Sequence, residues 1–566
     1  MEKLISPNDI IGSGLCIGCG SCAAQYSANG VTMQFDKYGE LKPQGQSEWF
    51  DTPSQALSAT CPFSPLAINE DQIALQNFPN AAEVSTTIGR YEQAYVGFSK
   101  KDSFRKNGSS GGMVSWVASA LLERGLIDGL VHVVAAPTTD SQSPLFSYRI
   151  SSSLDEIAQG AKSRYYPTEM ADVLKLIADS PGRYAVVGIP CFIKAVHLLR
   201  ATYPVFKERI PYTLGLFCGH MKSSKMVESF AMQAQLDFKS VSSIDFRSKK
   251  EGRPANLYFA KFFRSAEKPI EKNWELMADG DWGAGFFMNQ ACNFCDDVVS
   301  ETADISFGDA WIEPYSSDYR GTNVVIVRNR KLQDLIEAGL AADELSLTVV
   351  DAAFIEKTQA AGIRHRREGL SFRLAKRSPK TALKKRVAPR YRDIPLSRRI
   401  GYGLRYSISF WSHKMYLAST NMKQPRFYLV WAKVIGAVYQ KIIYHRVMLA
   451  TVLMGLKGLF LALMTNVAIS LFLVSPVISS MEYHSDVGYH AVGYPIMLSL
   501  FLIPAFIATT KKRLKSVYFD LFGISLTSAM ILLAIYKSAS PYAGLYSIFV
   551  VTNVILISRF LKQPVS

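Results

Sequence analysis

Three cysteines near the start of the chain, Cys16, Cys19 and Cys22, are separated by two-residue gaps. A fourth, Cys61, follows later and directly precedes Pro62. Two-residue gaps let one tight loop place three thiolates around a [4Fe–4S] cluster, and the fourth iron then takes the remote cysteine. Glycines within and before this loop allow the backbone to approach the inorganic sulfurs. A zinc site is the competing interpretation, although zinc normally takes two cysteine pairs.

The other four cysteines are scattered along the chain as Cys191, Cys218, Cys292 and Cys295. Cys191 follows a predicted strand and begins a predicted helix, whose positive end favours a thiolate. A single four-cysteine site would use all of them. Two alternatives remain open: one or two are inert core thiols, or Cys191 is a nucleophile.

The compartment predicted from the start of the chain is a reducing one. From Met1 onward there is no basic stretch followed by the apolar stretch of a signal peptide. Disulfides are therefore not expected, and we expect a cytoplasmic setting. Clustered cysteines in that setting indicate metal or redox chemistry.

Two polar stretches suit a phosphate-bearing aromatic cofactor. The first, Asn107-Gly108-Ser109-Ser110-Gly111-Gly112, directly precedes a predicted helix, and amides at a helix start bind phosphate. The second, Lys162-Ser163-Arg164-Tyr165-Tyr166-Pro167, offers two cations for a pyrophosphate and two aromatic rings for stacking. A simple capped turn and a solvated loop are the alternative interpretations.

The elements that must position these residues divide the 566-residue chain into several domains. Residues 1–75 have little periodicity, which predicts a small ferredoxin-type 4Fe–4S domain built around its cofactor. Residues 85–355 alternate between helical and strand-like patterns, which predicts an α/β (α+β) domain. Its predicted helices and strands are helices 111–124, 170–177 and 192–199 and strands 130–134 and 184–187.

Residues 356–446 form a basic segment, with 22 Lys or Arg against three Asp or Glu. This segment accounts for the net charge of +16. It shows no groove-reading element, so no nucleic acid is expected as a partner. We expect it to lie on anionic membrane lipids, or in part to dock on the preceding domain.

Residues 447–566 contain four apolar runs that approach the length needed to cross a bilayer, at 458–478, 492–509, 517–536 and 543–557. They predict a C-terminal all-α transmembrane region. Basic residues lie in the loop after the second run and at the chain end, so the positive-inside rule places both termini in the cytoplasm. The expected location is therefore the cytoplasmic (inner) membrane, multi-pass, with the redox domains in the cytoplasm.

Six separated motifs give the chain a resemblance to the family of coenzyme F-420 hydrogenase and dehydrogenase beta subunits. They are Cys16–Cys22 with Cys61-Pro62, Ser109-Ser110-Gly111-Gly112, Lys162-Ser163-Arg164-Tyr165, Gly188-Ile189-Pro190-Cys191, Phe246-Arg247-Ser248-Lys249, and Cys292-x2-Cys295 with Asp304-Ile305-Ser306 and Gly308-Asp309. The resemblance covers residues 1 to about 355. It implies two 4Fe–4S clusters and FAD, with the second and third motifs contacting FAD. It also implies a second cluster on Cys191, Cys218, Cys292 and Cys295.

The function that the resemblance implies is an FAD and 4Fe–4S dependent oxidoreductase, anchored in a membrane. Electrons would pass from ferredoxin or another reduced cofactor to a small-molecule or lipid-linked organic substrate. Bacterial members of the family are associated with surface-polysaccharide synthesis. The alternatives are an electron-transfer subunit that feeds a quinone or membrane partner, and a nonenzymatic scaffold with structural clusters. No catalytic acid or base is identified, since Asp309 and Lys249 could equally be members of structural ion pairs.

Overall fold

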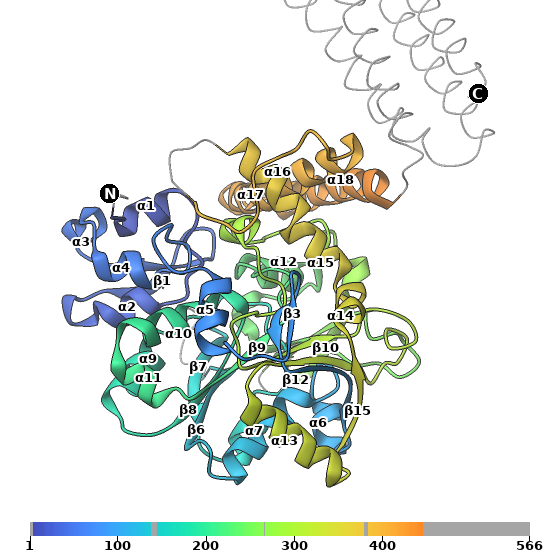
Figure 1. The fold of residues 1–566 in the computed structure, drawn as a ribbon. Coiled ribbons are helices and arrows are strands. Elements are labelled where there is room, and N and C mark those ends of the chain that lie inside the picture. The colour runs from blue at the N-terminus through green and yellow to red at the C-terminus, as the bar shows by residue number, and fades with distance from the viewer. Residues whose placement is uncertain (1–3, 137–143, 265–266, 378–382, 445–566) are drawn as a thin grey trace, which may run out of the picture. The chain divides into compact units, whose positions relative to one another are not determined.

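An eight-stranded mixed sheet lies at the centre of the protein, with strand order β15-β5-β14-β13-β9-β8-β6-β7 (Figure 1). The computed structural model describes residues 4–136, 144–264, 267–377 and 383–444. The strands of the sheet are β5 (Gln93–Ser99), β6 (Gly129–Ala135), β7 (Phe146–Ser151), β8 (Tyr184–Gly188), β9 (Tyr212–Leu216), β13 (Ile305–Asp309), β14 (Asn323–Val327) and β15 (Leu345–Val350).

The four central strands β13, β9, β8 and β6 pair in parallel, and antiparallel strands flank them on both sides. Parallel strands are covered on both faces, so their sequences are apolar almost throughout. Successive residues point to opposite faces: Leu130 joins the core on one side of the sheet, and Val131 joins the core on the other. The α/β prediction for this region is therefore confirmed.

Helices cover both faces of this sheet, and periodicity predicts three of them. Helices α7 (Met113–Glu123) and α13 (Arg330–Ala341) pack on one face, and α9 (Ala171–Asp179) and α10 (Pro190–Thr202) pack on the other. The three predicted helices and the two predicted strands all coincide with observed elements to within two residues at most boundaries. Pro190 occupies the first turn of α10, where its missing N–H costs no hydrogen bond.

The N-terminal residues form a small unit of short elements whose buried side chains join the α9–α10 core. Its elements are α1 (Pro7–Gly12), α2 (Ser21–Gln25), β1 (Thr32–Phe35), β2 (Leu41–Gln44), α3 (Ser47–Asp51), α4 (Gln55–Thr60) and α5 (Glu70–Asn77). A hairpin of β3 (Glu83–Ser85) and β4 (Gly89–Tyr91) leads into the large sheet.

A second, three-stranded antiparallel sheet follows α12 (Lys225–Gln233). It consists of β10 (Val241–Ser248), β11 (Phe259–Arg264) and β12 (Glu267–Asn273). The other short helices of this half of the chain are α6 (Asp102–Asn107), α8 (Leu154–Gln159), α11 (Pro204–Arg209) and the 3-10 helix η4 (Gln290–Phe294).

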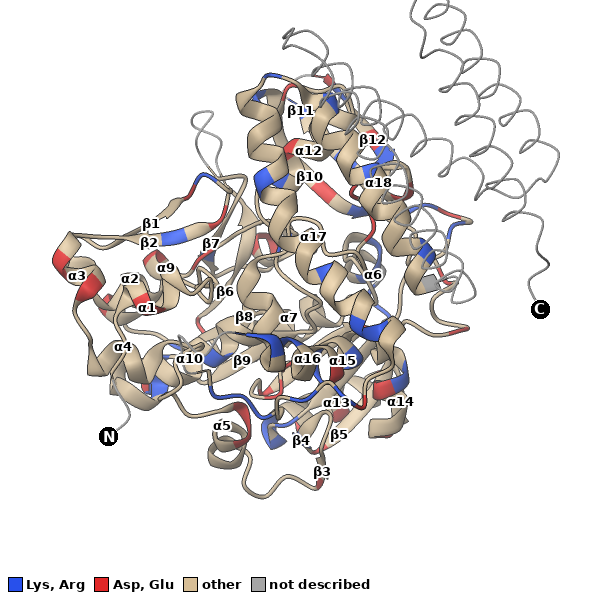
Figure 2. Cartoon of the chain, turned by 90° about the horizontal axis from the view of Figure 1, so that it is seen from above, with Lys and Arg blue, Asp and Glu red and all other residues tan. Residues whose placement is uncertain are grey.

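The basic segment begins within a run of helices that packs against the rest of the described chain. These helices are α14 (Ala352–Thr358), α15 (Ala360–Arg366), α16 (Glu368–Lys376), α17 (Leu396–Asn421) and α18 (Pro425–Tyr444). Ile408 of α17 and Tyr428 of α18 are 1% and 0% exposed, and both join the core around α12 and the small sheet. Lys and Arg recur along α15 to α17 (Figure 2).

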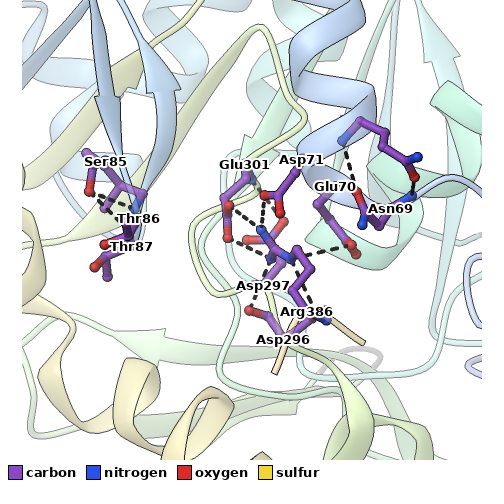
Figure 3. Close-up of polar contacts among 12 residues, drawn as sticks. Asn69, Glu70, Asp71, Ser85, Thr86, Thr87, Asp296, Asp297, Glu301 and Arg386 are labelled. Atoms are coloured by element: carbon purple, nitrogen blue, oxygen red, sulfur yellow. Dashed lines mark hydrogen bonds and ion pairs between the residues drawn. The ribbon is translucent and has the colours of Figure 1, made fainter. Parts of the chain in front are cut away.

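Ion pairs of Arg386 fix the irregular stretch that leads into α17. Arg386 reaches the carboxylates of Glu70, Asp71, Asp296 and Glu301 (Figure 3). The buried charge of Arg386 is therefore neutralised by acids far away in the sequence.

The predicted transmembrane region requires a correction. Across the described residues, the structure contains no helix that is both long enough and apolar enough to cross a membrane. The longest described helix, α17, carries Arg398, Arg399, Arg405 and Lys414 within its 26 residues. The all-α transmembrane region and the multi-pass inner-membrane location are thus not supported. The four apolar runs and the 447–566 domain, on which both predictions were based, lie outside the described residues.

Candidate redox site

The first four cysteines line one cavity of the N-terminal unit. Cys16, Cys19 and Cys22 come from the loop between α1 and α2 and from the first turn of α2, and Cys61 follows α4. Apolar side chains complete the wall: Ile10, Ile17, Leu57 and Phe63. The structure therefore brings together the four residues that the sequence predicted to share a cluster.

Two glycines shape this loop. Gly18 and Gly20 have φ values of 78° and 83°, a left-handed conformation that favours glycine. A Cβ atom on Gly18 would lie 2.5 Å from the carbonyl oxygen of Leu41, and one on Gly20 would lie 2.7 Å from the backbone nitrogen of Ala171. The loop can thus lie against β2 and α9 only because both positions lack a side chain.

The second four cysteines line another cavity. Cys191 is in the first turn of α10, Cys218 follows β9, and η4 supplies Cys292 shortly before Cys295. Strands β8 and β9 are parallel neighbours, so Cys191 and Cys218 lie beyond the same edge of the sheet. The positive start of α10 faces this group of thiols.

Burial makes both sets poor thiolates unless a cation binds them. Burial raises the pKa of Cys19 and of Cys292 to about 11, so each is a neutral thiol at pH 7. Within the described parts of the chain, no three Cys, His, Asp or Glu side chains converge closely enough to hold one metal ion. In a [4Fe–4S] cluster each cysteine binds a different iron, so four thiols that surround a cavity fit that group.

The two cavities share a wall. Ile17, which lies between Cys16 and Cys19, lines both of them, and so does Phe63, two residues after Cys61. Each of these side chains is 3% exposed. One layer of apolar side chains therefore separates the two cysteine sets.

Two cations that the sequence analysis did not identify hold the cysteine loops. Lys42 Nζ donates a hydrogen bond to the carbonyl oxygen of Cys16 at 2.7 Å and pairs with Glu40 at 2.8 Å. Arg366 Nη1 donates to the carbonyl oxygen of Cys292 at 2.6 Å. Both contacts are to backbone atoms, so no spacing of residue types in the sequence indicates them.

The two predicted FAD-contacting stretches meet in space. The backbone N–H of Ser163 donates to Ser109 Oγ at 2.8 Å. Gly112 begins α7 with a φ of 81°, and a Cβ atom there would lie 2.6 Å from the carbonyl carbon of Phe104. Gly111 is equally tight, because its Cβ would lie 2.8 Å from Asn323 Oδ1. The two stretches are thus in contact, although about fifty residues separate them in the sequence.

A lysine from a third motif joins this meeting point. Lys249 Nζ donates to the carbonyl oxygen of Ser110 at 3.0 Å and also to those of Arg105 and Arg320. Burial lowers the pKa of Lys249 to about 7. Its neighbour two residues earlier, Arg247, makes a two-point contact with Asp309 at 2.9 and 3.1 Å. Asp309 is thus a member of an ion pair.

The residues of the Lys162–Tyr165 stretch (the FAD strip) and Asn107 have different environments. Lys162 pairs with Asp245 at 3.0 Å, and the Arg164 guanidinium lies 4.8 Å from the centre of the Phe146 ring. The Tyr165 ring lies 4.7 Å from that of Trp282. Asn107 ends α6 with an exposed side chain.

An aromatic contact links this strip to the second cysteine set. Trp282 also stacks on His220 at 4.1 Å, and His220 follows Cys218 by two residues. His220 is 3% exposed, and burial lowers its pKa well below the usual value. The imidazole is therefore neutral at pH 7 and serves as a stacking surface.

Family models match both halves of the large sheet region. Residues 94–175 match the N-terminal model, and residues 182–353 the C-terminal model, of the coenzyme F420 hydrogenase/dehydrogenase beta subunit. The matched residues belong to this family. The match confirms the predicted family.

The named relatives have low sequence identity to this chain. The chain is 24% identical to a coenzyme F420-dependent sulfite reductase from Methanocaldococcus jannaschii over 58% of its own length and 47% of the relative's. It thus spans about half of that protein. It is 21% identical to one subunit of the F(420)H(2) dehydrogenase of Methanosarcina mazei, over 53% of this chain and 77% of the relative.

A solved structure is also similar to this chain. It is a chain from the F420-reducing [NiFe] hydrogenase complex of Methanosarcina barkeri, with a TM-score of 0.41 and 17% sequence identity. The match covers 54% of this chain and 99% of that one.

Proposed function

We propose that this protein is an iron–sulfur flavoprotein oxidoreductase with two [4Fe–4S] clusters and one FAD. The observation that carries the proposal is the pair of four-cysteine cavities that share Ile17 and Phe63 as a wall. Cysteine thiolates are the ligands of such clusters. A wall that is one side chain thick keeps the two sites close enough together for electron transfer. Two clusters with a purely structural role would not need to lie so close to each other.

The residues proposed to hold each group follow from this geometry. Cys16, Cys19, Cys22 and Cys61 would hold the first cluster, and the second cysteine set would hold the other. FAD would lie against the stretches 109–112 and 162–165, where backbone amides at the start of α7 and the side chains of Lys162 and Arg164 offer positive partners for its pyrophosphate. When bound, FAD supplies exchange between two-electron and one-electron transfer.

The chain's own residues then determine how the site works. Apolar side chains line the first cysteine cavity, and Lys42 and Arg366 fix the loops that carry the ligands. The Trp282 ring lies between Tyr165 of the proposed FAD strip and His220 beside Cys218. This contact makes a continuous path of packed aromatic side chains from the strip to the second cysteine set.

We propose that the electron donor is ferredoxin or a reduced cofactor of the F420 type, and that the acceptor is a small organic molecule. F420 is the cofactor in the names of both relatives, one of which is a reductase and the other a subunit of a dehydrogenase. The second name supports an alternative in which the chain passes electrons to a partner protein of the same complex.

The test is anaerobic purification of the full chain, with iron, acid-labile sulfide and released flavin measured per chain. We expect about eight irons, about eight sulfides and about one FAD. Zinc without flavin would refute the proposal. With the cofactors established, reduction of the chain by F420H2 or reduced ferredoxin, followed with and without added organic acceptors, distinguishes a reductase from an electron-transfer subunit.

A further inference from the structure

Arg366, at the end of α15, reaches the wall of the second cysteine cavity. It lines that cavity together with the four cysteines and is 2% exposed. Its Nη1 donates to the carbonyl oxygen of Cys292, and its Nη2 donates to that of Gly219, both at 2.6 Å. Longer contacts of 3.5 Å reach the carbonyl oxygens of Cys218 and Cys295. One guanidinium therefore ties together the two chain segments that supply three of the four thiols.

This buried cation has no carboxylate partner in the described portion of the chain. Its neighbour Arg367, in contrast, pairs with Glu301 at 3.4 Å. A buried charge without an opposite charge is strongly unfavourable. The groups that face Arg366 in the cavity are the four cysteines, whose sulfurs become negatively charged when they bind iron.

We propose that Arg366 is a positioning residue for the second cluster, which it serves in two ways. It holds the ligand loops in place through their carbonyl oxygens, and its positive charge raises the reduction potential of the cluster. A nearby positive charge stabilises the more negative, reduced form. The inference rests on the proposed function, because it requires a cluster at these cysteines. Arg366 lies beyond the family match, which ends at residue 353.

The experiment compares the full-length protein with three variants, all purified anaerobically. Arg366→Gln removes the charge, and Arg366→Lys keeps it without the two-pronged contact. Arg364→Gln is the matched control, because it removes one arginine charge from the exposed side of the same helix. Iron is counted for each protein, and the potentials of both clusters are measured by redox titration followed by electron paramagnetic resonance.

In Arg366→Gln we expect the potential of the second cluster to fall by at least about 59 mV, a tenfold change in the one-electron equilibrium. The first cluster and the Arg364→Gln protein should keep their potentials. In Arg366→Lys the fall should be smaller. If Arg366→Gln loses the second cluster, Arg366→Lys provides the test. A second cluster that Arg366→Lys retains, with a potential near that of the parent, supports the proposal.

Two results would overturn the inference. One is an Arg366→Gln protein with both clusters and unchanged potentials, and the other is loss of the second cluster from both Arg366 variants. A parent protein that lacks a second cluster is a different result, because it refutes the proposed function itself. The parent's own iron count and spectrum thus separate the two failures.

Discussion

Arg386 makes a two-point contact with Glu301 in the interior of the protein. Nη1 donates to Glu301 Oε2 at 2.6 Å, and Nη2 donates to Glu301 Oε1 at 2.9 Å (Figure 3). The two side chains are only 7% and 3% exposed. Glu301 belongs to the loop that follows Cys295, so this pair fastens the basic stretch before α17 to the region of the second cysteine set.

Replacement of Arg386 by Gln should therefore lower the free energy of unfolding by about 3–5 kcal/mol, because it removes the buried cation that Glu301, Glu70 and Asp296 share. Arg367 remains beside Glu301, at 3.4 Å. Urea unfolding of the purified protein measures this change. Arg390→Gln is the control, because Arg390 is 74% exposed and its partner Asp393 is 76% exposed. That variant should match the parent, since exposed pairs contribute little. Equal midpoints for the two variants would show that the buried network does not stabilise the fold.

The two cysteine sets should lose iron independently. Cys218→Ser should reduce the iron content from about eight to about four atoms per chain, because a serine oxygen is a poor substitute for a cluster thiolate. Cys61→Ser should remove the other four. Iron and acid-labile sulfide assays on anaerobic preparations measure both changes. A Cys218→Ser protein with the full iron content would identify the second set as core thiols.

The first cysteine set could be grouped from the sequence because a tight loop brings residues at two-residue gaps together whatever the rest of the fold does. The second set could not be grouped by spacing, since Cys191 and Cys292 are a hundred residues apart. The parallel pairing of β8 with β9 brings Cys191 and Cys218 to the same end of the sheet. The loop after Cys295 joins them through the backbone hydrogen bond from the Cys218 N–H to the carbonyl oxygen of Val298, at 2.9 Å. The resemblance to a family supplied that grouping.

The role of the basic segment was harder to predict. Its composition predicts contact with anionic lipids, but composition gives only the number of charges and not the residues that pair with them. Arg386 pairs with acids far away in the sequence, and Arg366 binds backbone carbonyl oxygens, which every residue has. The helices and strands of the large sheet, in contrast, followed from periodicity, because long apolar patterns dominate the choice of local structure.

Lys249→Gln should weaken retention of FAD. Lys249 connects the 109–112 turn to neighbouring loops through three carbonyl oxygens, so its loss should loosen the proposed pyrophosphate site. We expect at least a tenfold loss of affinity, measured by titration of the flavin-depleted protein with FAD and fluorescence detection. Lys250→Gln is the control, because the neighbouring lysine is 45% exposed and pairs with Glu271. Equal FAD affinity in the two variants would contradict a flavin site at this turn.

A buried histidine should make the stability of the protein depend on pH. His132 of β6 is 5% exposed, and its Nε2 lies 2.8 Å from Ser151 Oγ. Burial, and then the nearby Arg149, lower the pKa of His132 to about 4. Between pH 6.5 and 4 the unfolded chain therefore binds a proton that the folded chain excludes. The free energy of unfolding should fall across this range as pH decreases, by up to about 3 kcal/mol from this residue.

His132→Gln tests this dependence, because glutamine keeps a hydrogen-bonding group near Ser151 but does not titrate. Urea unfolding at pH 7.0 and pH 5.0 gives the loss of stability for each protein, and the loss should be smaller in the variant. Burial also lowers the pKa of His197, to about 3, and its contribution remains in both proteins. The difference between the two losses therefore isolates His132, even if the variant is less stable at both pH values. Equal losses in the two proteins would mean that His132 is protonated as easily in the folded chain as in the unfolded one.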